Sequence, residues 1–153
     1  MMTNKIKILV LLIFLFNGCD YKPIYSSQSD NNFSIELIDF NGNVEINNLL
    51  NKKLKRYQNK NVTKKFDIEI NSEYNKISQS KDRTGKTTDY KVIIKITFKI
   101  DDNKNFTTIQ LQEDFLIKSL ANKFEEKKYE KTKIENATSI IINAFIIQLS
   151  QIK

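Results

Sequence analysis

Residues 87–100 read TTDYKVIIKITFKI, and this stretch alternates apolar and polar side chains more regularly than any other part of the chain. Because successive side chains of a β-strand point to opposite faces of a sheet, the alternation predicts a strand with one buried face. Lys91, Lys95 and Lys99 would lie on its solvent face. The buried face would consist of Tyr90, Val92, Ile94, Ile96, Phe98 and Ile100.

A second alternating stretch, residues 66–78 (FDIEINSEYNKIS), is suited to pair with the first as an antiparallel hairpin. We expect the register that sets Glu69 opposite Lys99 on the solvent side. The same register sets Glu73 opposite Lys95. Opposite charges directly across a ladder contribute about 0.2–1 kcal/mol each, and a slip of one residue would exchange the two faces. The same lysines could instead bind an anionic ligand.

Two more strands and a short helix are indicated around this hairpin. Residues 33–40 alternate as a strand, and the Asn-Gly-Asn sequence at 41–43 predicts a turn. Residues 46–59 have helical apolar spacing, with Asn47 or Asn48 in position to cap the helix. Residues 106–117 alternate again, although Glu113 interrupts the apolar face and indicates a bulge or an edge position.

A long helix is predicted from about Glu125 to the end of the chain. Its apolar residues form one stripe, which is widened by further isoleucines, so the helix should be buried on more than one side. The stripe consists of Ile134, Ala137, Ile141, Phe145, Leu149 and Ile152. The order strand-helix-strand-strand-strand-helix predicts an α+β fold, with a four-stranded, mostly antiparallel sheet and both helices on its one apolar face.

The N-terminal stretch 5–25, KIKILVLLIFLFNGCDYKPIY, has the pattern of a secretory signal. Two lysines precede an uninterrupted apolar run over residues 8–16, which is too short to span a bilayer. Gly18-Cys19 resembles the cleavage site of bacterial lipoproteins, in which the cysteine takes a diacylglycerol and a fatty acid such as palmitate. Two or more acyl chains anchor a protein stably, whereas one is marginal.

We therefore expect a lipoprotein signal peptide at 1–18, a lipidated N-terminus and flexible tether at 19–32, and a single α+β domain at 33–153. The alternatives are a plain signal peptide with an incidental cysteine, or an N-terminal membrane anchor. Cys19 is the only cysteine of the chain.

Composition limits the classes of activity. The chain has no histidine, which excludes histidine-dependent nucleophilic catalysis and nearly all zinc sites. No second polar group is predicted to converge on the carboxylate pairs at 101–102, 113–114 and 125–126, so acid–base catalysis has no support. We expect no enzyme, no metal and no cofactor other than the lipid on Cys19.

The net charge of +7 suits an anionic partner such as nucleic acid, anionic lipid or phosphorylated glycolipid. A signal peptide argues against nucleic acid. Lys, Ile and Asn are all frequent and all have A/T-rich codons, so codon bias would give the same charge without any binding function.

The start of the predicted mature chain, Cys19-Asp20-Tyr21-Lys22-Pro23-Ile24-Tyr25, resembles the LptE family of lipopolysaccharide-assembly lipoproteins, in its alphaproteobacterial branch. The resemblance continues in a glycine-containing turn, Arg83-Thr84-Gly85, before a long strand, and in a C-terminal helix over 137–149.

This resemblance implies a non-enzymatic subunit of the lipopolysaccharide translocon. The domain would be anchored on the periplasmic side of the outer membrane, plug an LptD-like β-barrel and assist lipopolysaccharide assembly. Asp20 could instead retain the chain in the inner membrane, as aspartate at that position does in enteric bacteria. The alternative function is a binding or scaffold lipoprotein for another envelope partner.

A ligand contact is expected in the loop between the two hairpin strands. Lys81, Arg83 and Lys86 crowd there with only Asp82 to oppose them. Arg83 is one of two arginines in the chain, and its planar guanidinium suits phosphate groups of lipopolysaccharide. The alternatives are a solvated hairpin tip or a contact with the barrel wall.

Overall fold

The computed structural model describes residues 33–58, 62 and 64–152. The chain divides into two units, 1–30 and 31–153, and all described residues belong to the second. Cys19 and the predicted signal and tether therefore lie outside the described residues. The described unit contains β1 (Phe33–Gly42), α2 (Val44–Leu54), the 3-10 turn η1 (Lys55–Tyr57), β2 (Lys64–Lys81), β3 (Thr87–Asp101), β4 (Phe106–Lys118) and α3 (Lys123–Gln151).

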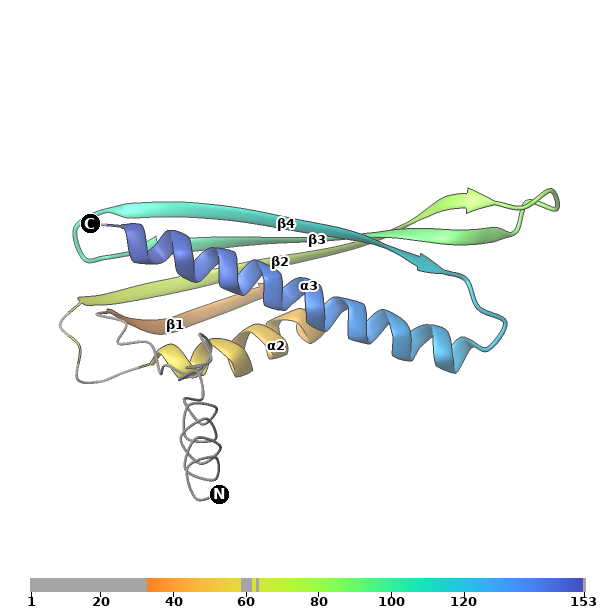
Figure 1. The fold of residues 1–153 in the computed structure, drawn as a ribbon. Coiled ribbons are helices and arrows are strands. Elements are labelled where there is room, and N and C mark those ends of the chain that lie inside the picture. The colour runs from red at the N-terminus through yellow and green to blue at the C-terminus, as the bar shows by residue number, and fades with distance from the viewer. Residues whose placement is uncertain (1–32, 59–61, 63, 153) are drawn as a thin grey trace, which may run out of the picture. The chain divides into compact units, whose positions relative to one another are not determined.

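The four strands form one sheet in the order β1-β2-β3-β4, and both helices lie on the same side of it (Figure 1). The predicted α+β fold is confirmed. The sheet is mixed because β1 runs parallel to β2, whereas β2, β3 and β4 are antiparallel to their neighbours. The helix α2 connects the two parallel strands, which need a crossover and cannot be joined by a tight turn.

The β2–β3 hairpin has the register predicted from its charges. Glu69 lies opposite Lys99, and Glu73 lies opposite Lys95. Both pairs form ion pairs on the solvent face, at 3.7 Å and 3.2 Å. The predicted salt bridges are therefore present, and a register slip would have placed these four charges against the helices.

The junction between β1 and α2 differs from the prediction. Asn43 caps α2, since its side-chain oxygen accepts from the Ile46 N–H at 3.1 Å, so the expected cap at Asn47 or Asn48 is wrong. Asn47 instead accepts a hydrogen bond from the buried Ser72 hydroxyl at 2.7 Å and donates to the Asn41 carbonyl at 3.1 Å. The helix consequently begins directly after the strand, with no separate loop.

Glu113 lies on an edge strand, which is one of the two positions, a bulge or an edge, that the sequence indicated. The pairing of β4 with β3 continues without a register shift from Phe106 to Lys118, so there is no bulge at Glu113. The charged side chain is accommodated because β4 is the last strand of the sheet in the part of the chain that the structure describes.

The core lies between the sheet and the helices. Phe98 of β3 stacks on Phe145 of α3 with ring centroids 3.8 Å apart, and both are fully buried. In α3 the predicted stripe is buried from Ile134 to Leu149, whereas most of the residues before Ile134 are exposed. The second, apolar half of α3 thus packs on the sheet. The first half has few buried apolar residues and must be held by other interactions.

Candidate functional site

The loop between β2 and β3 is shaped by Asp82. One carboxylate oxygen accepts from the Thr84 N–H at 2.8 Å, the Thr84 hydroxyl at 2.6 Å and the Lys86 N–H at 3.0 Å. The bond from the Thr84 hydroxyl, with help from the backbone N–H groups, lowers the pKa of Asp82 below its ordinary value. Gly85 completes the turn with a φ of +84°. Asp82, the acid within the loop, is thus engaged in holding the loop.

Of the predicted ligand residues, Lys81 is the last residue of β2, whereas Arg83 and Lys86 lie in the loop that follows it, and all three are exposed. Figure 1 shows the tip of the β2–β3 hairpin projecting beyond the helices. None of the ion pairs found among the described residues involves these three side chains. The loop therefore presents cationic groups at an accessible end of the sheet.

The lysines on the solvent face of β3 are in a different situation. Lys95 and Lys99 pair with the glutamates of β2, and Lys91 pairs with Asp114 of β4 at 3.1 Å. Such exposed pairs contribute only about 0–1 kcal/mol each, but they neutralise this face. An anion would have to compete with a carboxylate at each of the three positions.

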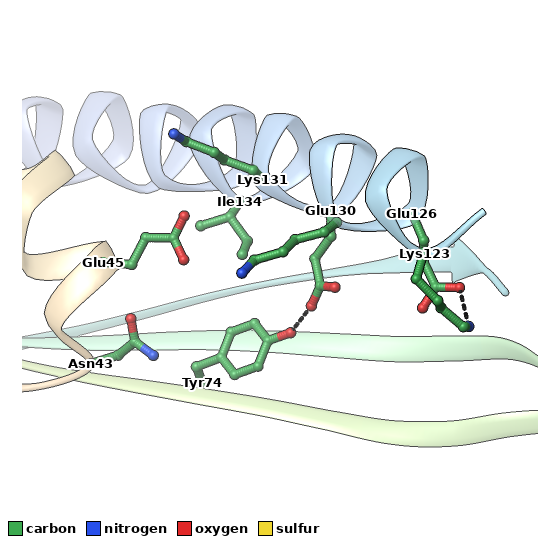
Figure 2. Close-up of a pocket in the computed structure, with 9 residues that line it drawn as sticks. Asn43, Glu45, Tyr74, Lys123, Glu126, Glu130, Lys131 and Ile134 are labelled. Atoms are coloured by element: carbon green, nitrogen blue, oxygen red, sulfur yellow. Dashed lines mark hydrogen bonds and ion pairs between the residues drawn. The ribbon is translucent and has the colours of Figure 1, made fainter. Parts of the chain in front are cut away.

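A second site, not predicted from the sequence, is a cleft between the start of α2, β2 and the first half of α3 (Figure 2). Its volume is about 370 Å³. Acidic side chains of α2 and α3 and basic side chains of α3 line it, together with Tyr74 of β2. The lining residues are Asn43, Glu45, Tyr74, Lys123, Glu126, Lys127, Glu130, Lys131 and Ile134.

Tyr74 and Lys76 reach from β2 to α3 at this cleft. The Tyr74 hydroxyl donates to the Glu130 carboxylate (Figure 2). The Lys76 ammonium lies 2.8 Å from Glu130 and 4.0 Å from Glu126. Burial raises the pKa of Tyr74, and the bond to Glu130 raises it further, so the phenol stays protonated and acts as a donor.

Glu126 is the most buried acid of this group, at 7% exposed. Its carboxylate accepts from the Lys123 ammonium and from the Leu120 N–H, both at 2.7 Å. These two bonds, with the one from Lys123 the stronger influence, lower the pKa of Glu126. The expectation that no polar group converges on the pair 125–126 is therefore wrong for Glu126.

Tyr74 and Lys76 of β2 contact Glu126 and Glu130 of α3, and these four residues, here called the latch, connect the sheet to the helix. Both carboxylates have cationic or hydroxyl partners, so neither is positioned as an unengaged acid or base. One sequence signal could have found it. Glu126 and Glu130 extend the stripe of Ile134 toward the N-terminus of the helix at i−4 steps, and Tyr74 continues the inner face of β2 beyond Ile70.

Two kinds of feature are absent from the described part of the chain. No cluster of three or more potential metal-binding side chains is found there. None of the helices in this part is both long and apolar enough to cross a membrane.

The fold resembles solved structures of bacterial lipoproteins. Rare lipoprotein B from Shewanella oneidensis superposes with a TM-score of 0.56 and 12% identity, covering 75% of this chain and 95% of that chain. An uncharacterized lipoprotein B from Nitrosomonas europaea superposes with a TM-score of 0.50 and 14% identity, covering 80% and 87%. No protein-family model and no curated protein matches the sequence. At these identities the likeness establishes a shared fold.

Proposed function

We propose that this chain is a lipid-anchored lipoprotein of the bacterial cell envelope. The observation that carries the proposal is a combination of two features. An apolar run ending in Gly18-Cys19 precedes a domain with the fold of rare lipoprotein B, whose name identifies it as a lipoprotein. Residues 1–18 are the signal peptide in this proposal, and Cys19 carries the lipid.

The lipid on Cys19 is directly testable. When the full chain is expressed in a bacterium fed a labelled fatty acid, we expect label in the wild type and loss of most label in Cys19→Ser. Ser26→Ala, a few residues further on, is the matched control and should be labelled like the wild type. Equal labelling of Cys19→Ser and the wild type would contradict the lipoprotein assignment.

The finer role that we propose is a non-enzymatic subunit of the lipopolysaccharide translocon in the outer membrane, bound to an LptD-like β-barrel. The CDYKPIY sequence at 19–25 supports it, and so does the fold. In this role the exposed cations of the β2–β3 loop, Lys81, Arg83 and Lys86, contact the phosphates of lipopolysaccharide.

The test of this role is capture of the tagged full chain from membranes solubilised in mild detergent. A large β-barrel protein should co-purify with it. If the chain is lipidated but no barrel protein co-purifies with it, the result would favour the alternative, a scaffold lipoprotein for a different envelope partner. The membrane that holds the chain should also be determined, by separating inner from outer membranes, because Asp20 could retain the chain in the inner membrane. Such retention would separate the chain from an outer-membrane barrel.

A further inference from the structure

The strand β4 presents an open backbone edge. It is the last strand of the sheet, and in the described part of the chain it is hydrogen-bonded in the sheet only to β3. Its pairing runs from Phe106 to Lys118 without a bulge, and the strand contains no proline. A long regular edge strand offers unpaired N–H and C=O groups to which another strand can bond.

The other edge of the sheet, β1, is interrupted. Its register with β2 shifts between Leu37 and Asp39, which leaves Ile38 as an extra residue. The Asp39 carboxylate then accepts from the Phe40 N–H at 2.8 Å and from the Asn41 side chain at 2.7 Å. Bulges and local side-chain bonds of this kind discourage strand pairing, so the two edges are not equivalent.

The flank of α3 beside β4 carries exposed apolar side chains. α2 packs against β1 and β2, and α3 packs against β3 and β4, so the flank of α3 that faces away from α2 lies beside β4. Lys131 faces α2 across the cleft. Ile140 follows nine residues later, which is about two and a half turns, and so lies on the opposite flank. Ile140 and Ile147 are 52% and 60% exposed.

We propose that β4 pairs antiparallel with β4 of a second copy of this chain and extends the sheet across a twofold axis. The register that pairs every residue of β4 puts Gln112 on the axis, opposite its own mate. Ile109 then meets Phe115 on the helix-covered face. The exposed flanks of the two α3 helices, with Ile140 and Ile147, face each other across the same axis.

Charge excludes one neighbouring register, and the number of paired residues disfavours the other. With Gln112 on the axis, no two like charges are directly opposite. Glu113 meets Leu111, Asp114 meets Gln110, and Lys118 meets Phe106. A register with Glu113 on the axis would set two carboxylates face to face, which destabilises an antiparallel pair. A register with Leu111 on the axis would leave Ile117 and Lys118 without partners inside the strand. The proposal does not rest on the proposed function.

Disulfide formation in the purified full chain tests the register. Directly opposed residues of antiparallel strands have Cα atoms about 4.5–5.5 Å apart, within the range that a disulfide bridges. Gln112→Cys should therefore give a covalent dimer on mild oxidation. Thr108→Cys lies on the same exposed face, but it would be about 27 Å from its mate, eight residues away along the strand. The Thr108→Cys variant should stay monomeric. The wild type is the control for any disulfide that Cys19 forms.

Sedimentation of the detergent-solubilised chain tests the association itself. The wild type should show a concentration-dependent dimer. Gln112→Lys, which sets two ammonium groups face to face, should weaken the dimer roughly two- to fivefold, and Thr108→Lys should not. A wild type that is monomeric throughout, or equal cross-linking at positions 112 and 108, would overturn the proposal. A different protein that binds wild type and is lost in Gln112→Lys would assign the edge to that protein and overturn it as well.

Discussion

Gly42 fixes the place where the end of β1 approaches β2. Its φ is +97°, and a Cβ atom there would lie 1.9 Å from the backbone oxygen of Ser72. That oxygen also accepts a hydrogen bond from the Asn43 N–H at 3.0 Å. Only glycine combines this left-handed backbone with so close an approach.

The substitution Gly42→Ala should therefore lower the free energy of unfolding by about 2–4 kcal/mol, because left-handed strain adds to a clash with backbone that cannot move aside. Gly85→Ala is the matched control. Gly85 also has a positive φ, of +84°, but a Cβ atom there would meet nothing within 4 Å. We expect a loss of only about 1 kcal/mol at Gly85. Urea unfolding measures both, and equal losses would show that the contact with Ser72 is not decisive.

At this scale the sequence indicates that the chain changes direction after β1, but it does not show the contact. The structure has no separate turn there, since Asn41 and Gly42 end β1 and Asn43 caps α2. Asn41-Gly42-Asn43 has turn chemistry, and a turn was predicted there. The partner, Ser72, is distant in the chain and becomes a neighbour only through the parallel pairing of β1 with β2. Ser72 is nevertheless a polar residue that is 2% exposed, in line with Ile68 and Ile70 on the inner face of β2. Such a break in an apolar face marks a place where a buried polar group needs a partner.

Among the elements, α3 joins an apolar half to a polar half. The apolar half is held by burial, and the polar half by the latch of Tyr74, Lys76, Glu126 and Glu130. Glu126→Gln should lower the free energy of unfolding by about 1–3 kcal/mol, because it weakens bonds to Lys123 and the Leu120 N–H at a buried position. Glu125→Gln, on an exposed neighbour, should change it little. Thermal unfolding of the two variants gives the comparison.

The same carboxylate predicts a dependence on pH. The pKa of Glu126 in the folded chain lies below its ordinary value of 4.5. Its stabilising effect is therefore complete above pH 4.5 and is lost as the pH falls through the lower folded pKa. The difference in stability between the wild type and Glu126→Gln should shrink over that acidic range. A difference that stays constant from neutral pH to below the folded pKa would contradict the role of the charge.

Sequence predicted the elements well where one face is apolar and the other carries complementary charges. The β2–β3 register follows from Glu69 and Glu73 because only one alignment both buries the apolar face and pairs these charges. The position of β1 does not follow in this way, since an apolar face says only that a strand is covered. The latch was missed because the salt bridge from Lys76 joins residues of β2 and α3 that are remote in sequence.

On the scale of the whole molecule, two groups of cations differ. The lysines on the solvent face of β3 form ion pairs, whereas the cations at the β2–β3 loop form none among the described residues. Lys91, Lys95 and Lys99 all face carboxylates, so the charge of each of these three lysines is offset by a neighbour on the sheet. The β2–β3 loop has its acid, Asp82, engaged with Thr84 and the Lys86 N–H. A basic composition could arise from codon bias alone, but within the described residues the cations at this loop differ from the three lysines of β3 in forming no ion pair.

The two places can be compared with variants that lose the same net charge. Arg83→Ala/Lys86→Ala removes two cations from the loop, and Lys95→Ala/Lys99→Ala removes two from the sheet. If the loop contacts phosphate groups, the loop variant should bind lipopolysaccharide roughly tenfold more weakly at low salt, about 1.4 kcal/mol. The sheet variant should bind nearly as the wild type does, since its lysines already face glutamates.

Salt distinguishes direct contact from an altered fold. At an ionic strength near 1 M the Debye length falls to about 3 Å, so the gap between wild type and the loop variant should narrow. Binding is measured with immobilised full-length chain at both salt concentrations, and the free energy of unfolding of each variant is measured alongside. A loop variant that binds like the wild type would remove the loop from the site. A weaker sheet variant of unchanged stability would move the site to the lysines of β3.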